Sequence, residues 1–320
     1  SLEAALNVTG AALFSSTVTV AGATHLQSTA SVGGAAIFAS TVTVVGNAVF
    51  TADIQKKTAG TSNFAAGVNA GNSIESGGNY NVAIGDEAGT AITTGDNNVA
   101  VGYAALDANT TGIQNIAIGS NALGLNTGNS NIAVGQAALD ANTTGTQNIG
   151  IGLNALGANT TANSNIAIGT NALDANTTGA SNTAVGENTL GSNTTAANNV
   201  AVGHVALDAN TTGTSNTAVG KSALTASTTA SNVTGIGYLA LAANTTGAQN
   251  VALGRSAGSA ITTGSNNVCI GYNSQLAAVG DNNEIVIGIS SATGKGSDTG
   301  FIAPGGGAMY NGQNSTVWVA

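Results

Sequence analysis

The feature that most constrains this chain is a short aliphatic pentapeptide that recurs every 17 residues. Each copy ends in a glycine, and thirteen such glycines run from Gly85 to Gly288. Eleven of the twelve intervals between them are 17 residues, and the remaining one, from Gly119 to Gly135, is 16. A period held this closely is typical of coils stacked one on the next. The sequence therefore predicts a solenoid whose length is set by the number of its coils.

Each coil carries an aliphatic alternation before its closing glycine, which we count as position 0. Position −1 is Ile, Val or Leu in all thirteen coils, position −3 is aliphatic in ten, and position −2 is usually Ala. A period of two is typical of a strand that buries one face, so we expect the large aliphatic residues to face the core. Position +4 is Leu in nine consecutive coils and is expected to fill a corner of that core. The expected core residues include Ile84, Val101, Leu106, Ile118, Leu123, Ile168, Leu173 and Leu207.

The polar part of each coil is equally regular. The leucine is followed by a segment such as ANTTG at 108–112. Its threonines favour a second short strand, and its Asn and Gly, which tolerate positive φ, are expected to form the turns. Position −4 is Asn in eleven coils, and stacked Asn side chains are expected to form an amide ladder up one edge of the stack.

Position +5 alternates between aspartate and glycine in successive coils. The aspartates are Asp107, Asp140, Asp174 and Asp208. Stacked coils rise by roughly 4.8 Å each, so two such aspartates lie about 10 Å apart along the stack, too far to share one metal ion. We interpret them as solvated charges that oppose edge aggregation; the alternative is a metal ion shared around a three-fold axis.

The predicted fold is therefore all-β, a parallel β-solenoid (β-roll) of about 13 coils over residues 81–288. Residues 1–58 follow a twelve-residue period, and one chain has too few apolar residues there to close a core, so we expect a β shaft shared by three chains. Residues 59–80 form a junction with a degenerate coil that ends at Gly67. Residues 289–320 break the pattern and are expected to form a C-terminal cap or a receptor-contacting tip, since aromatic side chains are favoured at binding hot spots. The candidate tip contacts are Phe301, Met309, Tyr310 and Trp318.

Composition argues against several classes of function. Net charge is −9 with only five Lys and Arg, so a nucleic-acid partner is not expected. No apolar run approaches 18 residues, so no membrane insertion is expected. His25 and His204 are isolated from each other in the sequence, and the single Cys269 stands where other coils have a small residue. We predict neither an enzyme nor a metal or cofactor site.

The repeat resembles two related families. The pentapeptides NVAIG (81–85), NIAIG (115–119 and 165–169) and NIAVG (131–135) are similar to head repeats of trimeric autotransporter adhesins of the YadA type. The longer unit NxAIGxxALxANTTGxx more closely resembles repeats of phage tail-fibre proteins. The resemblance implies a homotrimer of parallel β-rolls, and in such fibres a self-cleaving chaperone domain commonly follows the repeats. On that basis we expect NSTVWVA, at 314–320, to be the stump left by such a cleavage.

Three functions follow as hypotheses. The first is a structural fibre on a virion surface, attached to a baseplate, neck or other virion protein at one end and to a host-surface receptor, glycan or protein, at the other. The second is an extracellular bacterial trimeric adhesin. The third is an ice- or carbohydrate-binding solenoid that uses the regular threonine pairs. The period is equally compatible with a trimer and with a monomeric solenoid.

Overall fold

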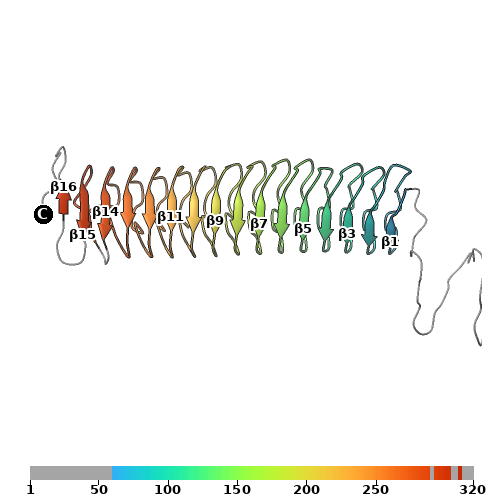
Figure 1. Cartoon of the computed structure of the whole chain (residues 1–320), viewed down its shortest axis with the longest axis horizontal. Coiled ribbons are helices and arrows are strands. Elements are labelled where there is room, and N and C mark those ends of the chain that lie inside the picture. Colours follow the sequence, from blue (N-terminus) through green and yellow to red (C-terminus); the bar gives the residue numbers. More distant parts are fainter. Residues whose placement is uncertain (1–59, 289–291, 304–308, 312–320) are drawn as a thin grey trace, which may run out of the picture. The chain divides into compact units, whose positions relative to one another are not determined.

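The computed structural model describes residues 60–288, 292–303 and 309–311, and these contain 16 strands and no helix. Figure 1 shows the strands side by side in one row along the stack. The strands are β1 (Phe64–Ala66), β2 (Val82–Ile84), β3 (Val99–Val101), β4 (Ile116–Ile118), β5 (Ile132–Val134), β6 (Ile149–Ile151), β7 (Ile166–Ile168), β8 (Thr183–Val185), β9 (Val200–Val202), β10 (Thr217–Val219), β11 (Thr234–Ile236), β12 (Val251–Leu253), β13 (Val268–Ile270), β14 (Ile285–Gly288), β15 (Gly300–Ala303) and β16 (Met309–Asn311). The expected twelve-residue shaft at 1–58 lies outside the described residues.

One sheet joins all these strands in sequence order, and β1 through β15 pair in parallel. The register places equivalent residues of successive coils opposite each other, as in Ala83 with Ala100 and Ile84 with Val101. The predicted parallel β-solenoid is therefore confirmed. It has about 14 coils, because the degenerate coil that ends at Gly67 supplies β1 and pairs in full with β2.

The core is built from the opposite strand face to the one the alternation predicted. The small residue at −2 points inward and is buried in every coil, whereas Ile84, Ile118 and Ile168 are 38%, 40% and 38% exposed. Val101 is half-buried. The prediction that these four residues form the core is wrong, because a 17-residue coil encloses little space. Alanines at −2 and +3, the leucine at +4 and two asparagines already fill it.

The leucines were predicted correctly: Leu106, Leu123, Leu173 and Leu207 are fully buried. Each adopts a left-handed backbone conformation, with φ between 52° and 55°. An L-residue other than Gly, Asn or Asp is uncommon in this region, and the strain is offset by burial of the side chain. The Asn and Gly of the ANTTG segment have no positive φ, so the predicted reason for their turn role is wrong. The asparagine nevertheless takes part in a turn, since the Asn109 N–H donates to the Leu106 carbonyl at 3.4 Å and Asn109 Nδ2 donates to the Gly112 carbonyl at 3.0 Å.

The threonine pair does not form a second strand. The hydroxyl of the first threonine instead donates to the carbonyl of its counterpart in the next coil, as from Thr143 to Thr160 at 3.0 Å and from Thr160 to Thr177 at 3.1 Å. The second threonine of each pair is exposed. This side of the coil is held by one side-chain bond and a few backbone bonds per rung rather than by a sheet ladder.

Two asparagine ladders cross the interior and link the coils. In the −4 ladder, Asn98 Oδ1 accepts the backbone N–H of Asn115 at 2.9 Å, and Asn98 Nδ2 donates to the carbonyl of Gly112 at 2.9 Å. In the second ladder, Asn176 Nδ2 donates to Asn159 Oδ1 at 3.0 Å. The predicted amide ladder is thus confirmed, but it lies in the interior rather than at an edge, and a second ladder of the ANTT asparagines accompanies it. Because both are buried, each bond also satisfies a group that would otherwise be costly to bury.

The closing glycine is required by geometry and by space. Gly152 has φ of +133°, and a Cβ placed there would lie 2.5 Å from the carbonyl oxygen of Gly169. The same combination recurs at equivalent glycines along the stack. Any side chain at position 0 would therefore be strained and would separate two coils.

The C-terminal end of the stack is closed around a buried carboxylate. Glu284 replaces the asparagine of the −4 ladder, and its Oε1 accepts hydrogen bonds from the backbone N–H groups of Lys295 and Gly296. Its Oε2 accepts from the N–H of Ala277 at 3.2 Å. β15 then extends the sheet in parallel, and β16 pairs with it in the antiparallel direction. The reversal of strand direction ends the repeated architecture.

Candidate interaction surfaces

The largest candidate surface is an apolar strip on the outside of the sheet, which we call the aliphatic face. It consists of the side chains at −3 and −1 of strands β2 through β14. These side chains are aliphatic except for Thr183, Thr217 and Thr234, and each is exposed or half-buried. A soluble monomer rarely exposes a contiguous apolar patch larger than roughly 300–600 Å². Two rows of aliphatic side chains along thirteen rungs make the aliphatic face a candidate interaction surface.

An apolar hollow of about 390 Å³ marks the C-terminal end of the aliphatic face. It is lined by three isoleucines, Ile270, Ile287 and Ile302, and by their neighbours Gly271, Tyr272, Gly288 and Ala303. Since its lining continues the −1 row, the hollow belongs to the same face.

The second candidate surface is a row of side chains that directly follow the closing glycines, at position +1. We call it the outer column. All of these residues are exposed except Ser120, which is half-buried. The outer column consists of Val68, Asp86, Tyr103, Ser120, Gln136, Leu153, Thr170, Glu187, His204, Lys221, Tyr238, Arg255 and Tyr272.

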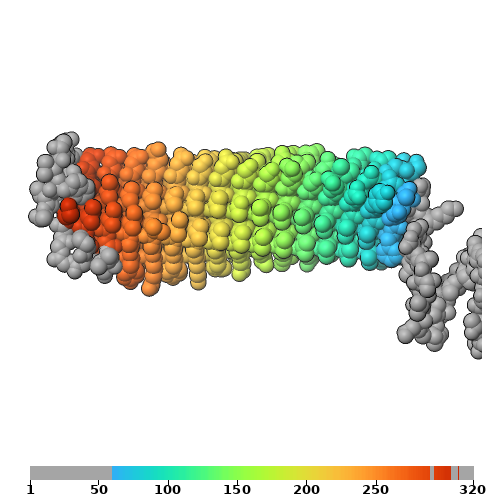
Figure 2. Space-filling view, viewed as in Figure 1, coloured from blue at the N-terminus to red at the C-terminus, as the bar shows by residue number. Residues whose placement is uncertain are grey.

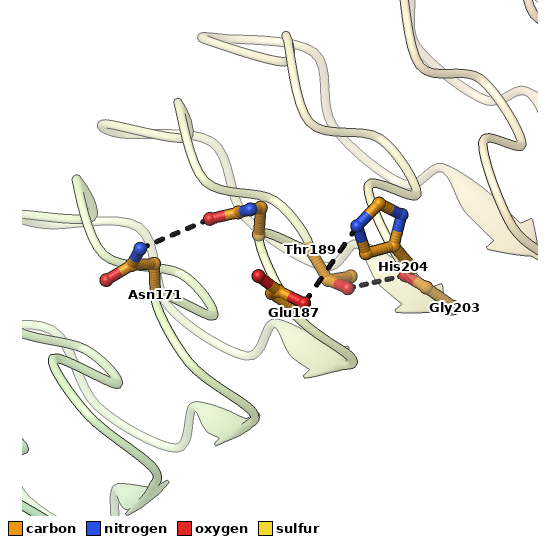
Figure 3. Close-up of polar contacts among 6 residues, drawn as sticks. Asn171, Glu187, Thr189, Gly203 and His204 are labelled. Carbon is orange, nitrogen blue, oxygen red and sulfur yellow. Dashed lines mark hydrogen bonds and ion pairs between the residues drawn. The ribbon is translucent and has the colours of Figure 1, made fainter.

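Neighbouring members of the outer column interact from rung to rung. His204 Nε2 lies 4.0 Å from a carboxylate oxygen of Glu187 one coil earlier (Figure 3). Further along, the guanidinium of Arg255 lies 5.7 Å from the ring centre of Tyr238 and 5.5 Å from that of Tyr272. A cation that lies between two aromatic rings is attracted to their faces, and its side chain is restricted to fewer rotamers. The column thus presents ordered chemical groups at the spacing of the coils.

Polar contacts beside the outer column hold the backbone that carries it. At position +2, Asn171 Nδ2 donates to Asn188 Oδ1 at 3.3 Å. At position +3, Thr189 replaces the usual alanine and donates to the carbonyl of Gly203 at 2.6 Å (Figure 3). These bonds run between coils, so they stabilise the rung spacing beneath the outer column.

The aspartates at +5 lie on a third side and are not freely solvated as predicted. Asp174 and Asp208 are half-buried, and a Cβ at the glycine one coil earlier would lie 2.8 Å from one carboxylate oxygen of each. The alternation of Asp and Gly follows from this packing, because the carboxylate occupies the space that a side chain would need. Burial raises the pKa of Asp107, Asp140, Asp174 and Asp208 above the ordinary aspartate value.

The remaining reactive side chains are dispersed. Cys269 is fully buried at a −2 position, and burial, together with the charge of Glu284, raises the pKa of its thiol to about 12. His204 is exposed beside one carboxylate, and His25 lies outside the described residues. Over the residues that the structure describes, no three His, Cys, Asp or Glu side chains gather as a metal site would require. The same residues include no helix long and apolar enough to cross a bilayer.

The candidate tip residues separate into different environments. Phe301 is only 9% exposed and lies under the ammonium group of Lys295, at 5.0 Å. It therefore packs as part of the cap and is not available as a tip contact. Met309 is 45% exposed on β16, and Tyr310 occupies the next position of that strand. Trp318 lies outside the described residues.

Figure 2 shows the coils as a continuous ridged surface along the stack. Sequence reasoning named neither the aliphatic face nor the outer column as a surface. The outer column could have been predicted, because position +1 is the most variable position of an otherwise repetitive coil. No protein-family model matches the chain, and no curated protein matches it.

Proposed function

We propose that this chain is a structural fibre of a virion that assembles as a homotrimer and extends a receptor-binding tip for host attachment. The observation that carries the proposal is the aliphatic face. A single chain leaves it in water over thirteen rungs, and three chains packed around a common axis would bury it. The resemblance of the repeat to trimeric fibres and adhesins favours three chains over two.

The mechanism that we propose is mechanical. Each coil adds backbone hydrogen bonds, two buried asparagine contacts and a slice of apolar core, so stiffness grows with coil number. Trimerisation adds the aliphatic faces to the buried surface and presents three copies of any contact at the tip. Three linked contacts bind more tightly than one through their effective concentration. One end of the fibre would hold a baseplate, neck or other virion protein, and the other would contact a host glycan or protein.

The assembly is tested by the native mass of the full chain. Analytical ultracentrifugation should give three times the chain mass of 30.5 kDa. Placing charge on the aliphatic face, as Ile151→Lys with Ile168→Lys, should dissociate the trimer, because each lysine must be desolvated in the interface. The matched control Thr161→Lys with Thr178→Lys adds the same charge to the exposed threonine side of similar coils and should leave the trimer intact. A wild-type monomer, or equal behaviour of both variants, would refute the proposed interface.

The location is tested separately with an antibody against residues 81–288. Immunogold electron microscopy should label appendages of virus particles from the source material. Label confined to the surface of bacterial cells would instead support the bacterial adhesin. The ice-binding hypothesis receives less support, because the first hydroxyl of each threonine pair is already committed to a carbonyl of the next coil. One exposed threonine per coil leaves a narrower array than the hypothesis requires.

A further inference from the structure

Thirteen coils begin at the closing glycines from Gly67 to Gly271, and they differ from one another at only some positions. Most positions keep one residue type or one chemical class, but position +1 holds eleven residue types in thirteen coils. Packing does not require this diversity, because the outer column is exposed along nearly its whole length. Surface positions that vary on a constant scaffold are where repeat proteins place their contacts.

Charge is distributed unevenly along the solenoid. No Asp or Glu occurs between Asp208 and Asp281, although the whole chain carries 14 acidic residues. The same stretch contains two cations, Lys221 and Arg255, and both belong to the outer column. The solenoid therefore offers a local positive potential over four consecutive rungs, which would attract an acidic molecule. We call the residues Lys221, Tyr238, Arg255 and Tyr272 the basic strip.

Neither cation of the basic strip, Lys221 or Arg255, is in an ion pair among the residues that the structure describes. Arg255 is held between two tyrosine rings, which orient the guanidinium without cancelling its charge. No ion pair among the described residues engages the guanidinium of Arg255, which leaves its N–H edge available to a ligand. Such an edge is suited to the oxygens of a carboxylate.

We propose that the basic strip binds an acidic polysaccharide, a polymer of carboxylate-bearing sugars, laid along the side of the solenoid. Lys221 and Arg255 are two rungs apart, which places them about 10 Å from each other along the stack. A linear polymer with regularly spaced carboxylates can contact both. Half-buried polar residues at +2, Ser222 and Ser256, lie next to the strip and supply partners for sugar hydroxyls.

The geometry favours a polysaccharide over single-stranded nucleic acid. Proteins that bind single strands offer aromatic faces on which bases stack. In the basic strip the facing sides of Tyr238 and Tyr272 are already taken by Arg255. One face of each ring is therefore unavailable for stacking on a base, while the tyrosine hydroxyls can bond to sugar hydroxyls. This inference does not depend on the assignment to a virion, and it places binding on the side of the solenoid rather than at its tip.

The test uses the purified full chain and measures binding by biolayer interferometry to immobilised polygalacturonate, dextran, dextran sulfate and oligo-dT. We expect binding to polygalacturonate that weakens with salt, and little or none to dextran. Lys221→Gln with Arg255→Gln should weaken polygalacturonate binding at least about tenfold, since charge-assisted bonds dominate the contact. The control Thr144→Glu with Thr178→Glu lowers the net charge by the same amount on another side and should bind like the wild type.

Several outcomes would overturn the proposal. These are no binding to polygalacturonate, equal binding to dextran, stronger binding to dextran sulfate or oligo-dT, or equal losses in the two double variants. The double variant Tyr238→Phe with Tyr272→Phe keeps the rings around Arg255 and removes only the hydroxyls. An intermediate loss of binding is expected, and unchanged binding would exclude the hydroxyl contacts. The mass of the assembly is measured on the same samples, so failure of this proposal is distinguishable from failure of the trimer.

Discussion

A single coil interrupts both asparagine ladders, and repairing it should stabilise the protein. In the coil between Gly220 and Gly237, Ser227 replaces the asparagine of the ANTT ladder and Val233 replaces that of the −4 ladder. At this interruption Asn210 Oδ1, one coil earlier, and Ser227 Oγ are buried with no hydrogen-bond partner among the described residues, as is Asn109 Oδ1 elsewhere in the ladder. We predict that Ser227→Asn restores the first ladder.

The magnitude follows from the neighbouring rungs. Asn210 Nδ2 donates to Asn193 Oδ1 at 2.9 Å and to the carbonyl of Gly213 at 3.0 Å. An asparagine at 227 would repeat this pattern by donating to Asn210 Oδ1 and to the carbonyl of Ala230. One added hydrogen bond contributes about 1 kcal/mol, and satisfying a buried acceptor recovers roughly another 1–3 kcal/mol. After the side-chain entropy of asparagine is subtracted, we expect the free energy of unfolding to rise by about 1–3 kcal/mol per chain.

The assay combines thermal unfolding with hydrogen exchange. For a domain of this size, each kcal/mol corresponds to a rise in Tm of roughly 2–4 °C. Amides of residues 221–237 should gain the largest protection, because the defect is local. The reciprocal variant Asn176→Ser creates the same gap in an intact coil and should lower Tm by a similar amount. If Ser227→Asn leaves Tm unchanged or lowers it while Asn176→Ser destabilises, the slot at 227 is already satisfied, for example by water, and the reasoning fails.

Three further predictions test the core, the closing glycines and the aspartates. Leu173→Asp should cost at least about 3 kcal/mol and prevent soluble assembly, because it leaves a buried carboxylate unpaired; an unchanged Tm would refute its placement in the core. Gly152→Ala should lower the free energy of unfolding by about 2 kcal/mol or more, because the alanine must adopt a positive φ and its Cβ would contact the Gly169 carbonyl. Chemical denaturation measures this loss against the control Thr161→Ala, which should be near neutral. Burial raises the pKa of Asp174 in the folded state, so the folded chain binds a proton there more readily than the unfolded chain does. This group therefore lowers the stability of the folded chain as pH rises. Asp174→Asn should therefore raise the denaturation midpoint at pH 7 and have little effect at pH 3, where both forms are neutral; a gain that persists at pH 3 would point to packing rather than charge.

The C-terminal segment shows how far sequence reasoning reaches at a site. The concentration of unusual residues after position 289 correctly indicates the end of the repeat, and Phe301 belongs to that end. Its burial could not be read from the sequence, because it depends on β15 adding one more parallel strand. The role of Glu284 could not be predicted from the sequence either. A single Glu at a position that is usually Asn looks like random variation until its contacts with two backbone N–H groups are known.

The sequence by itself determined the stacking, the period, the parallel register, the buried leucines and the −4 asparagine ladder. Each of these follows from repetition, because identical residues one period apart must lie opposite each other in stacked coils. Only the tertiary structure decided which face of each strand is inside. A period of two shows that Ile84 and Val82 share a face, but it does not say whether that face or Ala83 fills the interior. The narrow cross-section of a 17-residue coil admits the alanine and sends the larger side chains outward, where they form the surface on which assembly is proposed.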